Sequence, residues 1–197
     1  GYPDADELTL LAPLKSELPP EVFTSIYQPT TSDGHGFDRD NLLKAGNLLT
    51  DAGWVLKGQQ RVNAKTGQPR RFELLLPSGG NDQWVMPFQR NLQRLGVTMD
   101  IRQVDISQIT NRMRKRDYDM MPRLWRAMPW PSSDLQISWS SEYINSSYNS
   151  PGVASPAIDS LINQIIRWQG NKQKLLPLGR ALDRVLTWNY YMLPMWY

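Results

Sequence analysis

The feature that most constrains the fold is an alternation of short apolar segments with amphipathic segments through the middle of the chain. Apolar runs and period-two alternation predict strands, whereas apolar residues three and four positions apart predict helices. The expected order is a strand at 72–76, a helix at 82–95, a strand at 97–103, a helix at 105–115 and a strand at 118–125. This order favours parallel pairing through right-handed crossovers. The sequence therefore predicts an α/β lobe with a mixed or parallel sheet flanked by helices.

Three further helices are expected around this alternation, two of them from their capping residues. Asp38 is a candidate N-cap for a helix over 38–52. Ser155-Pro156 begins another helix, because serine caps well and proline suits the first helical position. The last helix is expected over 175–188, and Pro177 leaves its start open.

Proline, glycine and polar residues mark the segments between these elements. Residues 1–36 carry several prolines and lack sustained periodicity, so we expect an extended lead-in. Residues 57–70 are polar and rich in glycine and lysine, which predicts a turn, and 127–155 are expected to form a loop. The apolar end at 192–197 is expected to pair with another part of a longer chain.

Composition argues against several kinds of active site. The chain has no cysteine, which excludes disulfides, zinc ribbons, iron–sulfur clusters and cysteine nucleophiles. His35 is the single histidine, so neither a two-histidine metal site nor a catalytic triad can be built around it. We therefore expect a binding module that carries out no catalysis and holds no metal or organic cofactor. An α/β enzyme domain is the alternative, but it would need a nucleophile–base pair or a metal constellation.

Charge and hydropathy narrow the possible partners. The net charge is only +3, which is too slight an excess to imply nucleic acid by itself. A nucleic-acid-binding domain, suggested by interleaved arginine and tryptophan, is the less favoured alternative. The longest apolar runs, such as 74–76, are far too short to span a membrane. The first residues lack the basic start and apolar core of a signal peptide, so the signal of an exported parent is expected upstream.

A set of short motifs occurs in the order known from one protein family. Proline-rich pieces at the start come first, then a helical string, and then four shorter motifs. They are LAPL at 11–14, PP at 19–20, FDRDNLLKAGNLLTDAGW at 37–54, LQRLGV at 92–97, RDYDM at 116–120, SYNSP at 147–151 and IDSLI at 158–162. Each motif alone is weak evidence, whereas the ordered set over nearly the whole chain is specific.

This ordered set resembles the extracellular solute-binding proteins of family 5, the periplasmic oligopeptide- and dipeptide-binding proteins of ABC importers. The details are similar to the Yej-type branch, which is associated with import of peptides and of the peptide-nucleotide antibiotic microcin C. The resemblance implies a periplasmic protein of periplasmic-binding-protein type II fold that binds a peptide or peptide-like ligand between two lobes. It also implies an inner-membrane ABC permease as partner and no nucleic acid.

The resemblance further implies that this chain is the second lobe, from the C-terminal half of a longer polypeptide. On that basis residues 1–36 lead in from the hinge and 37–170 form the α/β second lobe. Residues 171–197 form the C-terminal helix and a return segment toward the missing N-terminal lobe.

The candidate ligand-binding residues follow the third expected strand. In α/β sheets the ligand crevice lies beyond the carboxyl ends of the strands. Aromatic rings and a thioether offer adaptable apolar surface there, and a guanidinium can bind a carboxylate or phosphate through two hydrogen bonds. The alternatives are that the tryptophans are core residues and that the arginine forms a surface salt bridge. The candidates are Trp125, Arg126, Met128, Trp130 and Asp134.

The positions directly after Trp125 depart from the family pattern. The resemblance implies an aspartate shortly after Trp125 that captures the free amine of the peptide. Arg126, Ala127 and Met128 occupy those positions here, and Asp134 is the nearest carboxylate downstream. We therefore expect a blocked N-terminus, such as that of a formyl-methionyl peptide, to be tolerated. Amine capture by Asp134 is the alternative.

Overall fold

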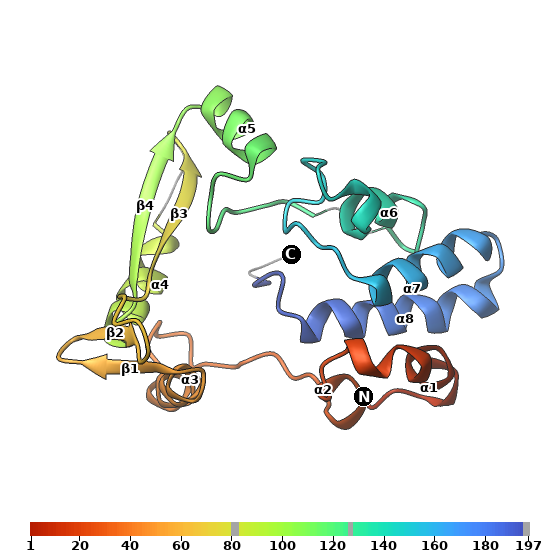
Figure 1. Cartoon of the computed structure of the whole chain (residues 1–197), viewed down its shortest axis with the longest axis horizontal. Coiled ribbons are helices and arrows are strands. Elements are labelled where there is room, and N and C mark those ends of the chain that lie inside the picture. Colours follow the sequence, from red (N-terminus) through yellow and green to blue (C-terminus); the bar gives the residue numbers. More distant parts are fainter. Residues whose placement is uncertain (80–82, 126–127, 195–197) are drawn as a thin grey trace. The chain divides into compact units, whose positions relative to one another are not determined.

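The computed structural model describes residues 1–79, 83–125 and 128–194 (Figure 1). The chain folds as two compact units, which we describe separately. Unit 1 consists of residues 1–28 together with the chain from Trp125 onward, and unit 2 is Pro29–Leu124. The chain thus leaves unit 1 after Gln28 and re-enters it at Trp125. Within the described residues, no helix is both long and apolar enough to cross a bilayer.

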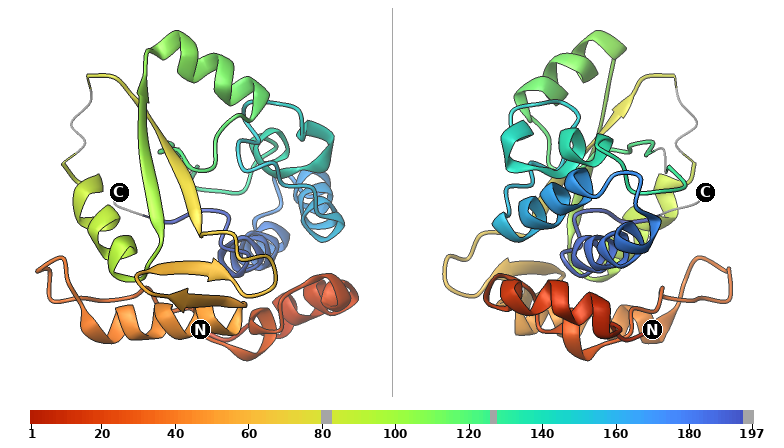
Figure 2. Two further views of the ribbon diagram at one scale, coloured as in Figure 1. Left: turned by 60° about the vertical axis from the view of Figure 1, so that its left-hand side comes forward. Right: turned by 90° about the vertical axis from the view of Figure 1, so that its right-hand side faces the viewer.

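The sheet of unit 2 is built on a parallel strand pair. Strand β3 (Arg71–Pro77) pairs in parallel with β4 (Thr98–Val104) in the register Arg71↔Thr98. Helix α4 (Val85–Arg94) forms the connection and packs on β4, and α5 (Ile106–Lys115) packs on β3 (Figure 2). The small core beneath them consists of Leu74, Leu76, Val85 and Met99. The expected strand–helix–strand–helix order is confirmed over this region.

Helix α3 (Arg39–Asp51) and an antiparallel hairpin complete unit 2. Asp38 is the N-cap of α3, and its carboxylate accepts a hydrogen bond from the Asn41 amide at 2.8 Å. Strands β1 (Trp54–Lys57) and β2 (Gln60–Asn63) form the hairpin. The prediction of a plain turn over 57–70 was therefore wrong. Gly58 adopts a φ of 60°, and a positive φ is what a two-residue hairpin turn needs.

The third expected strand, 118–125, was also wrong in extent. Met120 alone pairs with β3, as a parallel bridge to Leu74. Its carbonyl accepts from the Leu75 amide at 2.9 Å and its amide donates to the Glu73 carbonyl at 3.1 Å. The ladder stops there because Pro122 has no amide hydrogen to donate.

Unit 1 is helical, and its core lies around a pair of adjacent helices. Helices α7 (Pro156–Arg167) and α8 (Lys172–Trp188) lie side by side, and α1 (Ala5–Leu11) packs along α8 (Figures 1 and 2). The Ser155 and Pro156 start of α7 is confirmed. The shorter elements of unit 1 are α1 (Ala5–Leu11), the 3-10 helix η1 (Ala12–Glu17), α2 (Glu21–Thr24), α6 (Asp134–Trp139) and the 3-10 helix η2 (Ser141–Tyr143).

Two segments expected to be irregular are partly helical. The lead-in was predicted to be extended, but α1, η1 and α2 occupy most of its first 24 residues. Asp4 and Glu7 form a reciprocal capping box at the start of α1. The prolines up to Pro20 stand before helix starts or in a first helical turn, where no amide donor is required, so they do not imply extended chain, whereas Pro29 lies in irregular chain between α2 and α3. Likewise, α6 and η2 interrupt the loop expected at 127–155.

The C-terminal part of unit 1 differs from expectation at the start of its last helix. Helix α8 begins at Lys172, before the expected 175, and it continues through Pro177. Asn171 caps this start by accepting a hydrogen bond from the Lys174 amide. In the apolar end, Met192 and Leu193 are exposed, and residues 195–197 lie outside the described residues.

Candidate functional site

The first predicted site residue, Trp125, is partly buried against the core of unit 1. Its ring stacks on that of Trp139, with 4.7 Å between the ring centroids and 15° between the planes. Trp139 is itself buried, and it also lies 6.3 Å from the ring of Tyr191. The stack fixes the start of the candidate segment to unit 1. A direct contact of Trp125 with a ligand stays a prediction.

Two other candidates present apolar side chains to solvent. Met128 is 61% exposed and Trp130 is 42% exposed. The ammonium of Lys172, the first residue of α8, lies 5.4 Å from the centre of the Trp130 ring. A cation above a ring face is attracted by the ring quadrupole. Arg126 and its neighbour Ala127 lie outside the described residues.

Pro131 connects the candidate segment, which runs from Trp125 to Asp134, to the region of α7 and α8. The side-chain amide of Gln169 donates to the Pro131 carbonyl at 3.3 Å. The ring of Pro131 packs directly against Gly179 in the middle of α8. The sequence did not identify Gln169, Gly179 or Lys172 as neighbours of this segment, because each lies far from Pro131 along the chain. A glycine inside the expected last helix is the one sequence feature that could have drawn attention to this contact.

Asp134, the remaining candidate, is the first residue of α6 and is exposed. Its amide donates a long hydrogen bond, 3.4 Å, to the Ser132 hydroxyl. No described residue pairs with its carboxylate by a hydrogen bond or an ion pair. Met128, Trp130 and Asp134 therefore lie on one short exposed stretch, between the Trp125 stack and the body of α6.

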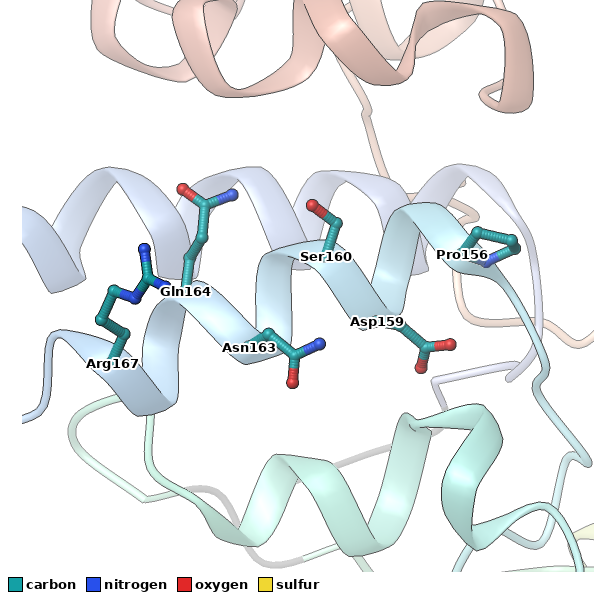
Figure 3. A pocket seen from close by; sticks show the side chains of 6 residues that line it. All are labelled: Pro156, Asp159, Ser160, Asn163, Gln164 and Arg167. Carbon is teal, nitrogen blue, oxygen red and sulfur yellow. The ribbon is translucent and has the colours of Figure 1, made fainter.

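A hollow of about 500 Å³ runs along α7, and none of these candidates lines it. Pro156 and five residues with polar side chains line it, and the Asp159 and Asn163 side chains point to one side of the helix while Ser160 and Gln164 point to the other (Figure 3). The Asp159 carboxylate accepts hydrogen bonds from the Ser141 amide at 2.8 Å and from the Ser141 hydroxyl. Asp159 therefore holds η2 in place and is not free to bind a ligand.

A second hollow, of about 490 Å³, lies between α1 and α8. The nearly buried Glu7 carboxylate is 3.7 Å from the Arg184 guanidinium, which also donates to the Gly1 carbonyl at 3.0 Å. Burial raises the pKa of the neighbouring Asp183 carboxyl, while the Arg184 charge opposes that shift. The predicted site residues do not line this hollow either.

The described residues gather no metal centre. Within 1–79, 83–125 and 128–194, no three carboxylate or histidine side chains come together in a way that could hold an ion. His35 is exposed, and its amide donates to the Asp33 carboxylate at 2.9 Å. The arrangement at 128–134 thus offers an aromatic face, a thioether and a carboxylate.

Comparison with known proteins identifies the family. The model for bacterial extracellular solute-binding proteins, family 5 Middle, matches residues 12–147. The chain is 80% identical over 197 residues to the uncharacterized protein YejA of Escherichia coli strain K12. It is 38% identical over 199 residues to the probable peptide-binding protein YejA of Agrobacterium fabrum strain C58. In each case all of this chain is covered, but only 33% and 32% of the relative, so the chain spans about a third of their length.

A solved structure shows the same fold at low sequence identity. The oligopeptide-binding protein AppA from Bacillus subtilis, solved in complex with a nonapeptide, matches with a TM-score of 0.65. The match covers 94% of this chain and 38% of AppA at 18% identity. This likeness confirms the expected α/β fold of the periplasmic-binding-protein type II kind. Together with the family match and the relatives, it shows that the chain belongs to the bacterial extracellular solute-binding proteins of family 5.

Proposed function

We propose that this chain is part of the substrate-binding component of an ABC importer that captures a peptide or peptide-like compound. The observation that carries the proposal is the family match over residues 12–147. The name of the Agrobacterium fabrum relative and the nonapeptide in the AppA complex favour peptides as the ligand class. The chain binds its ligand without catalysis and delivers it to an inner-membrane permease.

The rest of the protein supplies the other half of the binding cleft. In this proposal residues 37–170 are the α/β second lobe of a longer periplasmic protein. Residues 1–36 lead in from the hinge, and 171–197 return toward the N-terminal lobe. The chain length supports this arrangement, since the chain covers only about a third of its relatives. The ligand is enclosed when the two lobes close by hinge motion.

The stretch from Trp125 to Asp134 forms this lobe's side of the cleft. Trp130 and Met128 are exposed apolar groups and cover the ligand's side chains, while Arg126 binds a carboxylate or phosphate of the ligand. A peptide-nucleotide compound such as microcin C carries both kinds of group. The Yej-type resemblance supports it as one ligand of this protein.

A matched pair of tryptophans tests the proposal. Trp130 and Trp168 are 42% and 39% exposed, and each has a lysine ammonium above its ring, at 5.4 and 5.8 Å. Only Trp130 lies in the candidate segment. In the full-length protein, we expect Trp130→Ala to weaken peptide binding at least about tenfold, or ~1.4 kcal/mol. Trp168→Ala should leave binding unchanged.

Isothermal titration calorimetry with a short peptide measures both effects. Equal losses in the two variants would remove Trp130 from the site. A full-length protein that binds no member of a mixed peptide library would overturn the proposed function itself.

A further inference from the structure

Helix α8 contains two residues that are poorly suited to a helix interior. Pro177 lacks the amide hydrogen that the helix would use, and Gly179 loses more backbone freedom than any other residue on becoming helical. Both lie well inside Lys172–Trp188, away from either end. A glycine kept in such a position often has a packing reason.

The packing reason at Gly179 is the ring of Pro131. A Cβ atom added at position 179 would lie 2.5 Å from Pro131 Cγ and 3.5 Å from Pro131 Cδ. Carbon atoms in contact are normally about 3.5–4.0 Å apart. The proline ring therefore fills the space that any side chain at 179 would need. At Gly170, by contrast, an added Cβ would meet nothing within 4 Å.

Two further contacts hold the same short segment, one from the turn that precedes α8 and one from the first residue of α8. Gln169 donates its side-chain amide to the Pro131 carbonyl at 3.3 Å, and the Lys172 ammonium lies over the Trp130 ring at 5.4 Å. All three contacts fall on two consecutive residues, Trp130 and Pro131. The position of the exposed Trp130 ring is thus set by how closely Pro131 approaches α8.

We propose that Gly179 is a positioning residue for the ligand-binding segment. Because Gly179 has no side chain, the Pro131 ring can pack against α8. That packing contact determines where Met128 and Trp130 meet the ligand. Gly179 itself touches no ligand and acts only through Pro131. This inference rests on the proposed function, because it assigns the role of Gly179 to the same binding segment.

A double-mutant cycle in the full-length protein tests whether packing of Pro131 against Gly179 controls peptide binding. Gly179→Ala should push Pro131 outward and weaken peptide binding at least about tenfold. In a Pro131→Ala background the ring atoms that cause the clash are gone. There the same Gly179→Ala change should alter the dissociation constant by less than about threefold. Gln173→Ala, an exposed change in the same helix, is the control and should have no effect.

The outcomes separate this inference from the proposed function. Unchanged affinity in a folded Gly179→Ala protein would overturn the positioning role, while peptide binding by the unaltered protein would leave the proposed function standing. Equal losses in both backgrounds would also overturn it, because a general weakening of α8 does not depend on Pro131. If Gly179→Ala does not fold, Pro131→Ala alone decides: it should loosen the segment and lower affinity, and unchanged affinity would contradict the positioning role.

Discussion

Asn149 illustrates how a single buried side chain organises unit 1. It is fully buried, and its amide donates to the Ser140 carbonyl at 3.0 Å and to the Val153 carbonyl at 2.8 Å. Its side-chain oxygen accepts from the Val153 amide at 2.9 Å. One residue thereby satisfies three backbone groups that the surrounding irregular chain cannot pair by itself. The asparagine of the SYNSP motif is thus structural in this fold.

We expect Asn149→Ala to lower the free energy of unfolding by about 3 kcal/mol, because it leaves buried backbone groups without partners. Urea unfolding measures the loss. Asn149→Asp keeps the acceptor for Val153 but loses both donors, so it should also destabilise. Asn145→Ala, at an exposed position, should change stability by less than about 0.5 kcal/mol. A mild effect of Asn149→Ala would contradict the structural role.

Asp134 bears on which peptide ends are accepted. Its carboxylate is exposed, and it is the nearest one downstream of the positions where an amine-capturing aspartate was expected. We expect the full-length protein to bind a free and an N-formylated peptide of the same sequence with affinities within about threefold of each other. Calorimetry with both peptides measures this. A wide preference for the free peptide that Asp134→Asn abolishes would make Asp134 the anchor and contradict the expectation.

At the level of single elements, the stability that the Asp105 N-cap contributes to α5 depends on pH. The Asp105 carboxylate accepts from the Gln108 amide and from the Gln108 side chain, both at 2.9 Å. The backbone hydrogen bond first, and the side-chain bond after it, lower the pKa of Asp105 below its ordinary value. Since the folded pKa is the lower one, the cap's contribution is complete above about pH 4. It is lost as the pH falls through the depressed pKa.

Asp105→Asn keeps an oxygen acceptor but removes the titrating charge. We therefore expect the variant's stability to fall less steeply than that of the unaltered protein as the pH drops below about 4. Urea unfolding between about pH 3 and 7 measures the difference. Asn145→Ala, an exposed change that involves no titrating group, should leave the shape of the profile unchanged. Parallel profiles for Asp105→Asn and the unaltered protein would contradict the prediction.

Elements with a capping side chain could be predicted from the sequence, while those that depend on distant partners could not. Asp38 and Ser155 cap helices as expected, and Asp105 does the same for α5. The Asp4–Glu7 capping box carried the same information for α1, but the surrounding prolines obscured it. The hairpin was not predicted because Arg61 is a charged residue that a sequence pattern places on the surface. In the structure it is buried, and its guanidinium donates to the Leu95 and Trp54 carbonyls and to the Thr50 hydroxyl.

The sequence indicated which stretch of residues forms the candidate site, but not which distant residues that stretch contacts. Its position beyond the sheet region led to the stretch beginning at Trp125, and Trp130 and Met128 in it are exposed. Its fastening to Gln169, Lys172 and Gly179 could not be predicted. Those contacts join segments far apart in the chain, and no local pattern of residues encodes them.

At the level of the whole molecule, the proposed function makes this chain only one part of a ligand-binding surface. We expect the isolated chain to bind peptides far more weakly than the full-length protein, because the proposed cleft encloses the ligand between two lobes. Losing half of the desolvated contacts costs much more than tenfold in affinity, and each ~1.4 kcal/mol is a factor of ten. Calorimetry on both proteins with one peptide gives the comparison. Comparable affinities would contradict a shared cleft.

The division of unit 1 into two stretches of chain has a consequence for synthesis on the ribosome. Leu11 and Val22 are buried in the same core as residues of α7 and α8, which are translated only after all of unit 2. A seven-residue helix such as α1 is not stable by itself. Unit 2 is continuous and has every partner for its own core once Leu124 has emerged. Since chains fold from the N-terminus as they emerge, unit 2 can fold first, and the core around Leu11 and Val22 is completed only when α8 has been made.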